Sequence, residues 1–201
     1  MLIQHVPLLS TKRIVLASAS PRRAELLRGL GLKIEIFPST FEEDLDKSLF
    51  ANPGEYAKET ATRKAHDVYQ KIQESQVLEK PRDVDDARRM LSSLSGQVHK
   101  VYTGVALVTP KSSGSNSGSS PLLTSFYEGT EVEFAELEEQ SILAYIASEE
   151  PMDKAGAYGI QGLGGSFVKC IHGCYFNIMG FPIHRFSVEV DRLVKSGAIT
   201  A

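Results

Sequence analysis

The sequence is poor in cysteine, and it lacks both tryptophan and any long apolar run. Its two cysteines, Cys170 and Cys174, are too few for a disulfide framework and indicate a reducing compartment. No segment approaches the roughly 20 consecutive apolar residues that span a membrane, and residues 1–11 lack a signal-peptide pattern. We therefore expect a cytoplasmic protein that does not bind membranes.

An excess of basic residues is also missing. Lysine and arginine together number 22 and aspartate and glutamate 25, which gives a net charge of −3. Electrostatic binding of nucleic acid usually needs the opposite balance, so we expect no nucleic-acid partner. The Rossmann glycine fingerprint and the P-loop lysine are absent as well. An anionic ligand must therefore be bound by a local cluster of basic residues.

Apolar patterns predict a mixture of strands and helices, which favours an α/β or α+β fold. The predicted strands cover residues 13–17, 34–38, 98–108, 122–134 and 166–171. The predicted helices begin near residues 21, 55, 83, 136 and 183 and end near residues 29, 73, 94, 148 and 195. Residues 109–121 (TPKSSGSNSGSSP) are low in complexity and predict a flexible loop between two antiparallel strands. We expect a single domain over residues 1–201.

Residues 18–23 (SASPRR) connect the first predicted strand to the first predicted helix. Ser20 suits the N-cap position and Pro21 the first helical position. A helix N-terminus offers free backbone N–H groups and a partial positive charge, which disfavours arginine unless an anion lies there. Arg22 and Arg23 are therefore either phosphate ligands or part of a solvated basic turn.

Residues 153–162 (DKAGAYGIQG) form the most specific local motif. Their glycines permit a close approach of the backbone to other groups. Lys154 could bind phosphate, Tyr158 could stack on a ligand or pack in the core, and Gln161 could read a base edge as donor and acceptor. The alternative is a glycine-rich surface loop without a binding role.

Other candidates are less specific. Lys64 lies late in a predicted helix and Lys80 precedes a proline, and either could contact phosphate or simply be solvated. The acidic run at residues 42–44 could bind Mg²⁺ or form a solvated loop. Residues 170–174 hold two cysteines and a histidine, which are too few ligands for a structural zinc site.

Together these motifs resemble the Maf family, in the order typical of that family and over nearly the whole chain. The matching segments are LASASPRR at 16–23, KA at 64–65, EKP at 79–81, LSG at 94–96, His99, VYTGV at 101–105 and DKAGAYGIQG at 153–162. This combination is far more specific than any one motif.

The resemblance implies an α/β fold of the inosine triphosphatase-like type, with an elongated mixed sheet flanked by helices and a cleft between two lobes. It implies hydrolysis of a nucleoside triphosphate to the monophosphate and pyrophosphate, with Mg²⁺ or Mn²⁺ as the divalent cation. Arg22 and Gln161 are similar to the branch that accepts dTTP, UTP and related pyrimidine nucleotides. The oligomeric state stays open, with a homodimer as one alternative.

The resemblance also implies roles for individual residues. The phosphate ligands would be Ser18, Arg23, Lys64, Lys80 and Lys154, and Glu43 would fall at the family's acidic metal-binding position. These roles come from the match between motifs and not from spacing or periodicity.

One feature of the family is absent from the sequence. The family has a buried strand before the Lys80 loop that ends in a Gly-x-Asp-Thr pattern, and its aspartate is the proposed general base. Here residues 68–78 (VYQKIQESQVL) are polar and contain no such pattern. Asp67 and Glu43 are the remaining candidates for the base. Loss of a general base costs on the order of 10²–10⁴ in rate, so we expect low activity.

Two explanations of this difference compete. The chain is either a splice form or gene model that lacks an exon of an active enzyme, or a non-catalytic nucleotide-binding homologue. A third reading of the chain as a whole is a misfolded or partner-dependent fragment. Loss of a central strand would damage a sheet as well as remove a base. For that reason we favour the first explanation.

Overall fold

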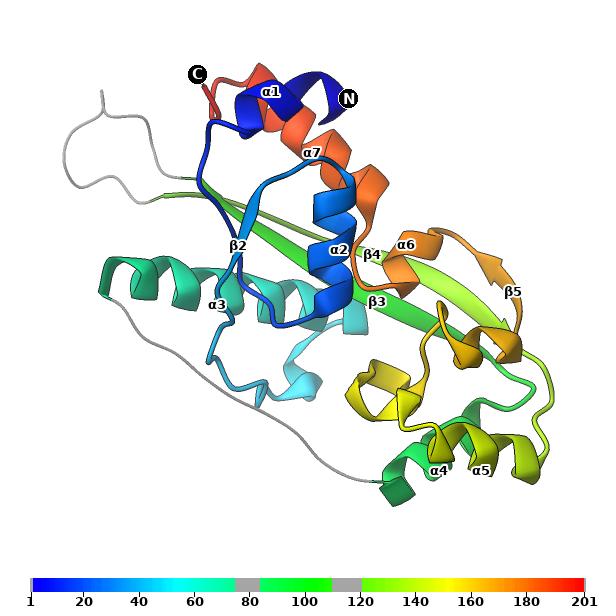
Figure 1. The fold of residues 1–201 in the computed structure, drawn as a ribbon. Coiled ribbons are helices and arrows are strands. Elements are labelled where there is room, and N and C mark those ends of the chain that lie inside the picture. Colours follow the sequence, from blue (N-terminus) through cyan, green and yellow to red (C-terminus); the bar gives the residue numbers. More distant parts are fainter. Residues whose placement is uncertain (1, 75–83, 110–120, 201) are drawn as a thin grey trace. The chain divides into compact units, whose positions relative to one another are not determined.

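The structure is a computed structural model that describes residues 2–74, 84–109 and 121–200. The chain divides into two compact units (Figure 1). Unit 1 comprises Met1–Leu78, Tyr102–Glu128 and Gly180–Ala201, and unit 2 comprises Glu79–Val101 and Gly129–Met179. Helices and strands are mixed, so the expected α/β class is confirmed. A single domain over the whole chain stays a prediction.

Five strands form two sheets in the described residues. Their bounds are β1 Ile14–Leu16, β2 Ile34–Ile36, β3 Val98–Thr109, β4 Leu122–Phe134 and β5 Val168–His172. β1 and β2 pair in parallel, and the second sheet has the order β3-β4-β5 with β5 antiparallel to β4. All five strands lie where the sequence predicts them.

β3 and β4 are antiparallel neighbours. Lys100 pairs with Glu131, whereas Thr109, further along β3, bonds to Leu122 at the beginning of β4. The paired positions move in opposite directions along the two strands, which confirms the predicted orientation. Residues 110–120 of the predicted flexible loop lie outside the described residues.

The five helices predicted from the sequence are confirmed within a few residues. They are α2 Pro21–Gly29, α3 Pro53–Glu74, α4 Val84–Leu94, α5 Glu139–Ala147 and α7 Ile183–Lys195. Shorter elements were not predicted, because three to five residues carry no helical periodicity. These are η1 Leu2–His5, α1 Val6–Leu9, η2 Lys47–Leu49, η3 Glu150–Asp153, η4 Ala155–Ala157, η5 Leu163–Phe167 and α6 Tyr175–Ile178. Within the described ranges, no helix has the length and apolar character to cross a membrane.

Unit 1 contains a direct backbone approach between α3 and β3. A Cβ atom added to Gly104 of β3 would lie 1.9 Å from the carbonyl oxygen of Ala57 on α3. No residue with a side chain fits such a contact without movement of the helix or the strand. The glycine therefore fixes how closely α3, which carries Lys64 and Asp67, packs on β3.

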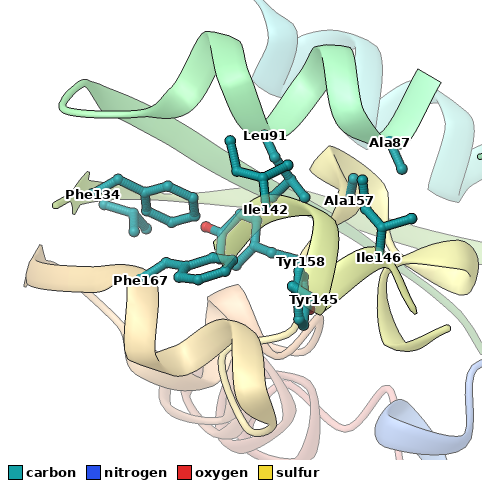
Figure 2. Packing of buried hydrophobic residues seen from close by; sticks show 10 residues of the cluster. Ala87, Leu91, Phe134, Ile142, Tyr145, Ile146, Ala157, Tyr158 and Phe167 are labelled. Atoms are coloured by element: carbon teal, nitrogen blue, oxygen red, sulfur yellow. The ribbon is translucent and has the colours of Figure 1, made fainter. Parts of the chain in front are cut away.

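The core of unit 2 is formed by α4, α5, β4 and the glycine-rich segment (Figure 2). Its buried members are Ala87, Leu91, Val132, Phe134, Ile142, Tyr145, Ile146, Ala157, Tyr158 and Phe167. The Phe134 ring contacts the Tyr158 ring edge-on at 4.7 Å between centroids, a favourable geometry for aromatic pairs. Ala157 and Tyr158 of the 153–162 motif are thus part of the core.

Candidate functional site

The loop before α2 holds Arg23 in a fixed position in unit 1. Ser20 caps α2, since its Oγ accepts the backbone N–H of Arg23 at 3.4 Å. The Arg23 Nε donates to the carbonyl oxygen of Gly180 at 2.8 Å, and its Nη1 donates to Ser18 Oγ at 3.4 Å. Ser18 Oγ also accepts the backbone N–H of Ser20 at 3.2 Å. The guanidinium is therefore oriented before any ligand binds.

The charges of Arg22 and Glu43 both act on Arg23. Burial lowers the pKa of Arg23, the Glu43 carboxylate raises it, and the Arg22 guanidinium lowers it. Glu43 also forms an ion pair with Lys64. The Nε of Arg22 is buried and has no hydrogen-bond partner within the part of unit 1 that the structure describes. The structure thus gathers the predicted site residues of unit 1 into one cluster: Ser18, Arg22, Arg23, Glu43 and Lys64.

Asp67 is engaged by a different segment of unit 1. Its Oδ2 accepts the Ser39 hydroxyl at 2.5 Å and the Thr40 backbone N–H at 2.9 Å, and the carboxylate pairs with Lys71. Burial raises the pKa of Asp67, but these hydrogen bonds outweigh burial and leave it below the usual value. A carboxylate with a low pKa and occupied oxygens is poorly suited to take a proton from water.

Contacts from α3 hold the whole segment 39–43, which carries Glu43. The Tyr56 hydroxyl donates to the Glu43 carbonyl oxygen at 3.5 Å. The Arg63 guanidinium lies 5.9 Å from the centre of the Phe41 ring. Together with the Asp67 bonds, these contacts fix the backbone on both sides of Phe41. Such contacts were not predicted, because they join residues more than ten positions apart and no local pattern encodes them.

Unit 2 carries the other two described candidates, Lys154 and Gln161. The Lys154 Nζ donates to the carbonyl oxygen of Glu150 at 2.5 Å. Gln161 is exposed, in a turn at residues 160–161. This arrangement leaves the Gln161 amide accessible to a ligand, whereas the Lys154 ammonium is held against its own loop.

Glu150 contacts the loop that carries Lys154 and Gln161, and it was not among the residues predicted from the sequence. Its carboxylate accepts the Tyr145 hydroxyl at 2.9 Å and the backbone N–H groups of Leu163 at 2.8 Å and Gly164 at 3.3 Å. Burial raises the pKa of Glu150, but the hydrogen bonds and the charge of Lys154 lower it overall. An acidic residue just before a glycine-rich loop was the available signal, but its partners lie 13 and 14 residues away.

Tyr158 packs in the core of unit 2. Its hydroxyl lies 2.9 Å from His99 Nε2, and the His99 ring also meets Phe134 edge-on at 5.0 Å. Burial raises the pKa of Tyr158 and lowers that of His99. Of the two roles that the sequence left open for Tyr158, the structure shows packing.

Glu43 is the carboxylate that lies within the arginine cluster. No group of three or more histidine, cysteine, aspartate or glutamate side chains that could hold a metal occurs in residues 2–74, 84–109 and 121–200. Mg²⁺ commonly binds proteins through one or two carboxylates and takes its other ligands from phosphate and water. One carboxylate beside a cluster of cations that are predicted to bind phosphate fits that mode. Lys80 lies outside the described residues.

Comparison with known proteins identifies the family. The family model described as "Maf-like protein" matches residues 13–193. The chain belongs to the Maf-like protein family.

Individual relatives resemble the chain over most of its length. It is 41% identical to a dTTP/UTP pyrophosphatase of Clostridium perfringens, over 86% of this chain and 93% of the relative. It is 43% identical to a dTTP/UTP pyrophosphatase of Acetivibrio thermocellus, over 87% of this chain and 92% of the relative.

A longer relative is also similar. A human protein named probable bifunctional dTTP/UTP pyrophosphatase/methyltransferase is 45% identical over 90% of this chain. The match covers 32% of that human protein, so this Maf-like chain spans about a third of its length.

Proposed function

We propose that this Maf-like chain binds dTTP, UTP and related pyrimidine nucleoside triphosphates and hydrolyses them slowly to monophosphate and pyrophosphate. The observation that carries the proposal is the cluster around the N-terminus of α2, with two arginines, a lysine and Ser18. A chain with net charge −3 has no general attraction for anions, so these cations need a local reason. The names of the bacterial relatives support the substrate class.

Each residue of the cluster has a distinct role in the proposal. Arg23 is already bonded to Gly180 and Ser18, so it would present its remaining N–H donors to phosphate without reordering. Arg22 has a buried Nε that lacks a partner among the described residues, and a phosphate oxygen would satisfy it. Lys64 would exchange its Glu43 partner for phosphate.

In the described part of unit 2, the proposed ligand-binding residues are Lys154 and Gln161. Lys154 would contact phosphate, and the exposed Gln161 amide would pair with the base edge through its donor and acceptor. Lys80, outside the described residues, is proposed as a further phosphate ligand from its motif alone. Removal of either lysine should therefore weaken binding of any nucleoside triphosphate, irrespective of its base.

The proposed cofactor is Mg²⁺ or Mn²⁺. Glu43 would hold the ion, with phosphate oxygens and water as its other ligands. The ion would neutralise charge that develops on the phosphates. A ligand-bound ion would also draw Glu43 away from Lys64, which frees the ammonium for phosphate.

Water activation is the step for which this chain is poorly equipped. Asp67 has its oxygens occupied by Ser39, Thr40 and Lys71, and its pKa is lowered. Glu43 is already paired with Lys64 and is the proposed metal ligand. Both candidate bases are therefore engaged by other groups, and the sequence contains no Gly-x-Asp-Thr pattern. The second candidate function, nucleotide binding without turnover, rests on this same observation.

The deciding experiment measures pyrophosphate release from dTTP and UTP with Mg²⁺ or Mn²⁺, beside calorimetric binding of the same nucleotides. The chain as written is compared with a version in which a Gly-x-Asp-Thr strand precedes Val77. Slow pyrophosphate release by the chain as written and rapid release by the version with the added strand support the proposal. Binding without release by the first, at either metal, supports the non-catalytic alternative. Absence of both binding and release in both versions rejects the two functions together.

A further inference from the structure

The glycine-rich loop of unit 2 is organised around one side chain that the proposed chemistry does not use. We infer that Glu150 is a positioning residue, which fixes the turn at residues 160–161 so that Gln161 can read the base of a bound nucleotide. The inference rests on the proposed function, since it assigns base recognition to Gln161. It adds a residue that acts through Gln161 and does not itself touch the ligand.

Glu150 holds the chain on both sides of the candidate ligand-binding residues. Its carboxylate accepts the N–H of Leu163 at 2.8 Å and of Gly164 at 3.3 Å, just after the turn. Its backbone carbonyl accepts Lys154 Nζ at 2.5 Å, before the turn. A single residue therefore anchors the loop that carries both Lys154 and Gln161.

Tyr145 extends this anchor to the start of the turn. Its hydroxyl donates to the Glu150 carboxylate at 2.9 Å and accepts the Gly159 N–H at 3.0 Å. Tyr145 is itself 4% exposed and belongs to the hydrophobic core of unit 2 (Figure 2). Gln161 thus lies between two hydrogen-bonded positions. Gly159 bonds directly to Tyr145 of the core, and Leu163 bonds to Glu150, which in turn bonds to Tyr145.

The glycines of the loop are explained by the same anchor. A Cβ atom on Gly162 would lie 2.3 Å from Glu150 Oε2, and one on Gly164 would lie 2.5 Å from the Tyr145 hydroxyl. The loop backbone therefore lies directly on these two side chains. A looser role for Glu150, as a solvated surface charge, would not require glycine at either position.

Fixing the turn before binding has a measurable consequence. A ligand that contacts a mobile loop must offset the entropy lost when that loop becomes ordered, which weakens its affinity. Loss of the Glu150 bonds should therefore reduce the part of the affinity that depends on the base. The part that depends on the phosphates should change less, because the arginine cluster is held by other contacts.

The test compares binding of UTP with binding of inorganic tripolyphosphate, both with Mg²⁺, to the whole chain by calorimetry. The dissociation constant for tripolyphosphate divided by that for UTP reports what the nucleoside contributes to the affinity, and this quotient is the ratio compared below. Glu150→Gln keeps the shape but places an NH₂ group opposite at least one of three donors. We expect it to lower the ratio by roughly three- to tenfold, the range of one or two lost hydrogen bonds. The matched control Glu149→Gln removes the same charge one position earlier, at an exposed side chain, and should leave the ratio unchanged.

A double-mutant cycle separates positioning from a general structural role. If Glu150 acts through Gln161, then Glu150→Gln should have little further effect on the ratio in a Gln161→Ala background. Tyr145→Phe is the second variant and decides the case if Glu150→Gln shows no cooperative unfolding. It removes one bond to Glu150 and one to Gly159, and should lower the ratio in the same direction.

Each outcome bears on a definite claim. An unchanged ratio in folded Glu150→Gln, or an equal decrease with and without Gln161, overturns the positioning role and leaves the proposed function intact. If the unaltered chain binds UTP no better than tripolyphosphate, base recognition by Gln161 is wrong and the inference fails with it. If it binds neither, the proposed function itself is rejected.

Discussion

Asp67 and Glu150 perform the same physical task in different units of the chain. Each carboxylate accepts a backbone N–H group from a segment near a candidate ligand-binding residue. Burial raises the pKa of both carboxylates, but hydrogen bonds lower each pKa overall: those of Lys71 and Ser39 contribute most at Asp67. The Leu163 N–H and the Tyr145 hydroxyl contribute most at Glu150. Hydrogen bonds to an ionised carboxylate are stronger than those between neutral groups, so these anchors resist loosening. A role of Asp67 as general base stays a prediction, and its bonds show that it holds residues 39 and 40.

Asp67→Asn should destabilise the protein at neutral pH by about 1–2 kcal/mol, since the amide cannot accept from Ser39, Thr40 and Lys71 together. The folded-state pKa of Asp67 lies below its unfolded value. Its contribution is therefore present above the unfolded pKa and is lost as pH falls through the folded pKa. Urea unfolding from pH 7 to pH 3 should show a smaller decrease in stability for the variant than for the parent. Parallel curves would contradict this role.

His99 provides a second pH dependence of stability, which arises from burial and not from hydrogen bonds. Burial beside Phe134 and Tyr158 lowers its folded-state pKa, so the unfolded chain binds the proton more tightly. Stability is then complete above the unfolded pKa near 6.5 and falls as pH decreases below it. Replacing the ring by His99→Gln should flatten this part of the stability curve between pH 7 and pH 5. The measurement is the urea midpoint of both proteins at each pH, and an equal slope would reject the assignment.

The elements show which parts of a sequence predict structure and which do not. α2 was predicted with its Ser20 cap and an end near residue 29, because both signals are local. The predicted helices and strands all follow from periodicity over several residues. The contacts of Asp67 with residues 39–40, and of Glu150 with residues 163–164, were not predictable, since they depend on tertiary packing.

Substitution of alanine for Gly104 and for Gly29 compares a crowded glycine with an uncrowded one. Gly104→Ala would place a methyl group 1.9 Å from the Ala57 carbonyl oxygen, so α3 or β3 must move. We expect a loss of about 1–3 kcal/mol, as for overpacking elsewhere. Gly29→Ala meets no atom within 4 Å and lies in α2, so it should keep or raise stability. Thermal unfolding of both variants tests the contact, and an unaffected Gly104→Ala protein would show that α3 does not pack on β3 as described.

At the scale of the whole molecule, the described strands form two separate sheets of unequal size. The β1–β2 sheet has two parallel strands of three residues, whereas the β3-β4-β5 sheet is larger and antiparallel. Parallel strands usually lie in larger, covered sheets, and two short strands give few ladder bonds. The resemblance to the family predicts a further buried strand that ends in Gly-x-Asp-Thr, and the sequence contains no such pattern. If this strand is missing, its loss is expected to affect stability as well as chemistry.

Three versions of the chain separate these two effects. One carries the Gly-x-Asp-Thr strand before Val77, a second carries the same strand with asparagine in place of its aspartate, and a third carries a Gly/Ser segment of equal length. Both strand versions should melt at least about 4 °C above the unmodified chain, since about 1 kcal/mol shifts the midpoint by roughly 2–4 °C at this size. The aspartate version alone should release pyrophosphate rapidly, because the base and not the strand activates water.

If the Gly/Ser version gains the same stability, added length and not a strand is responsible. If the asparagine version is as active as the aspartate version, the base lies elsewhere in the chain, and Glu43 becomes the residue to replace next.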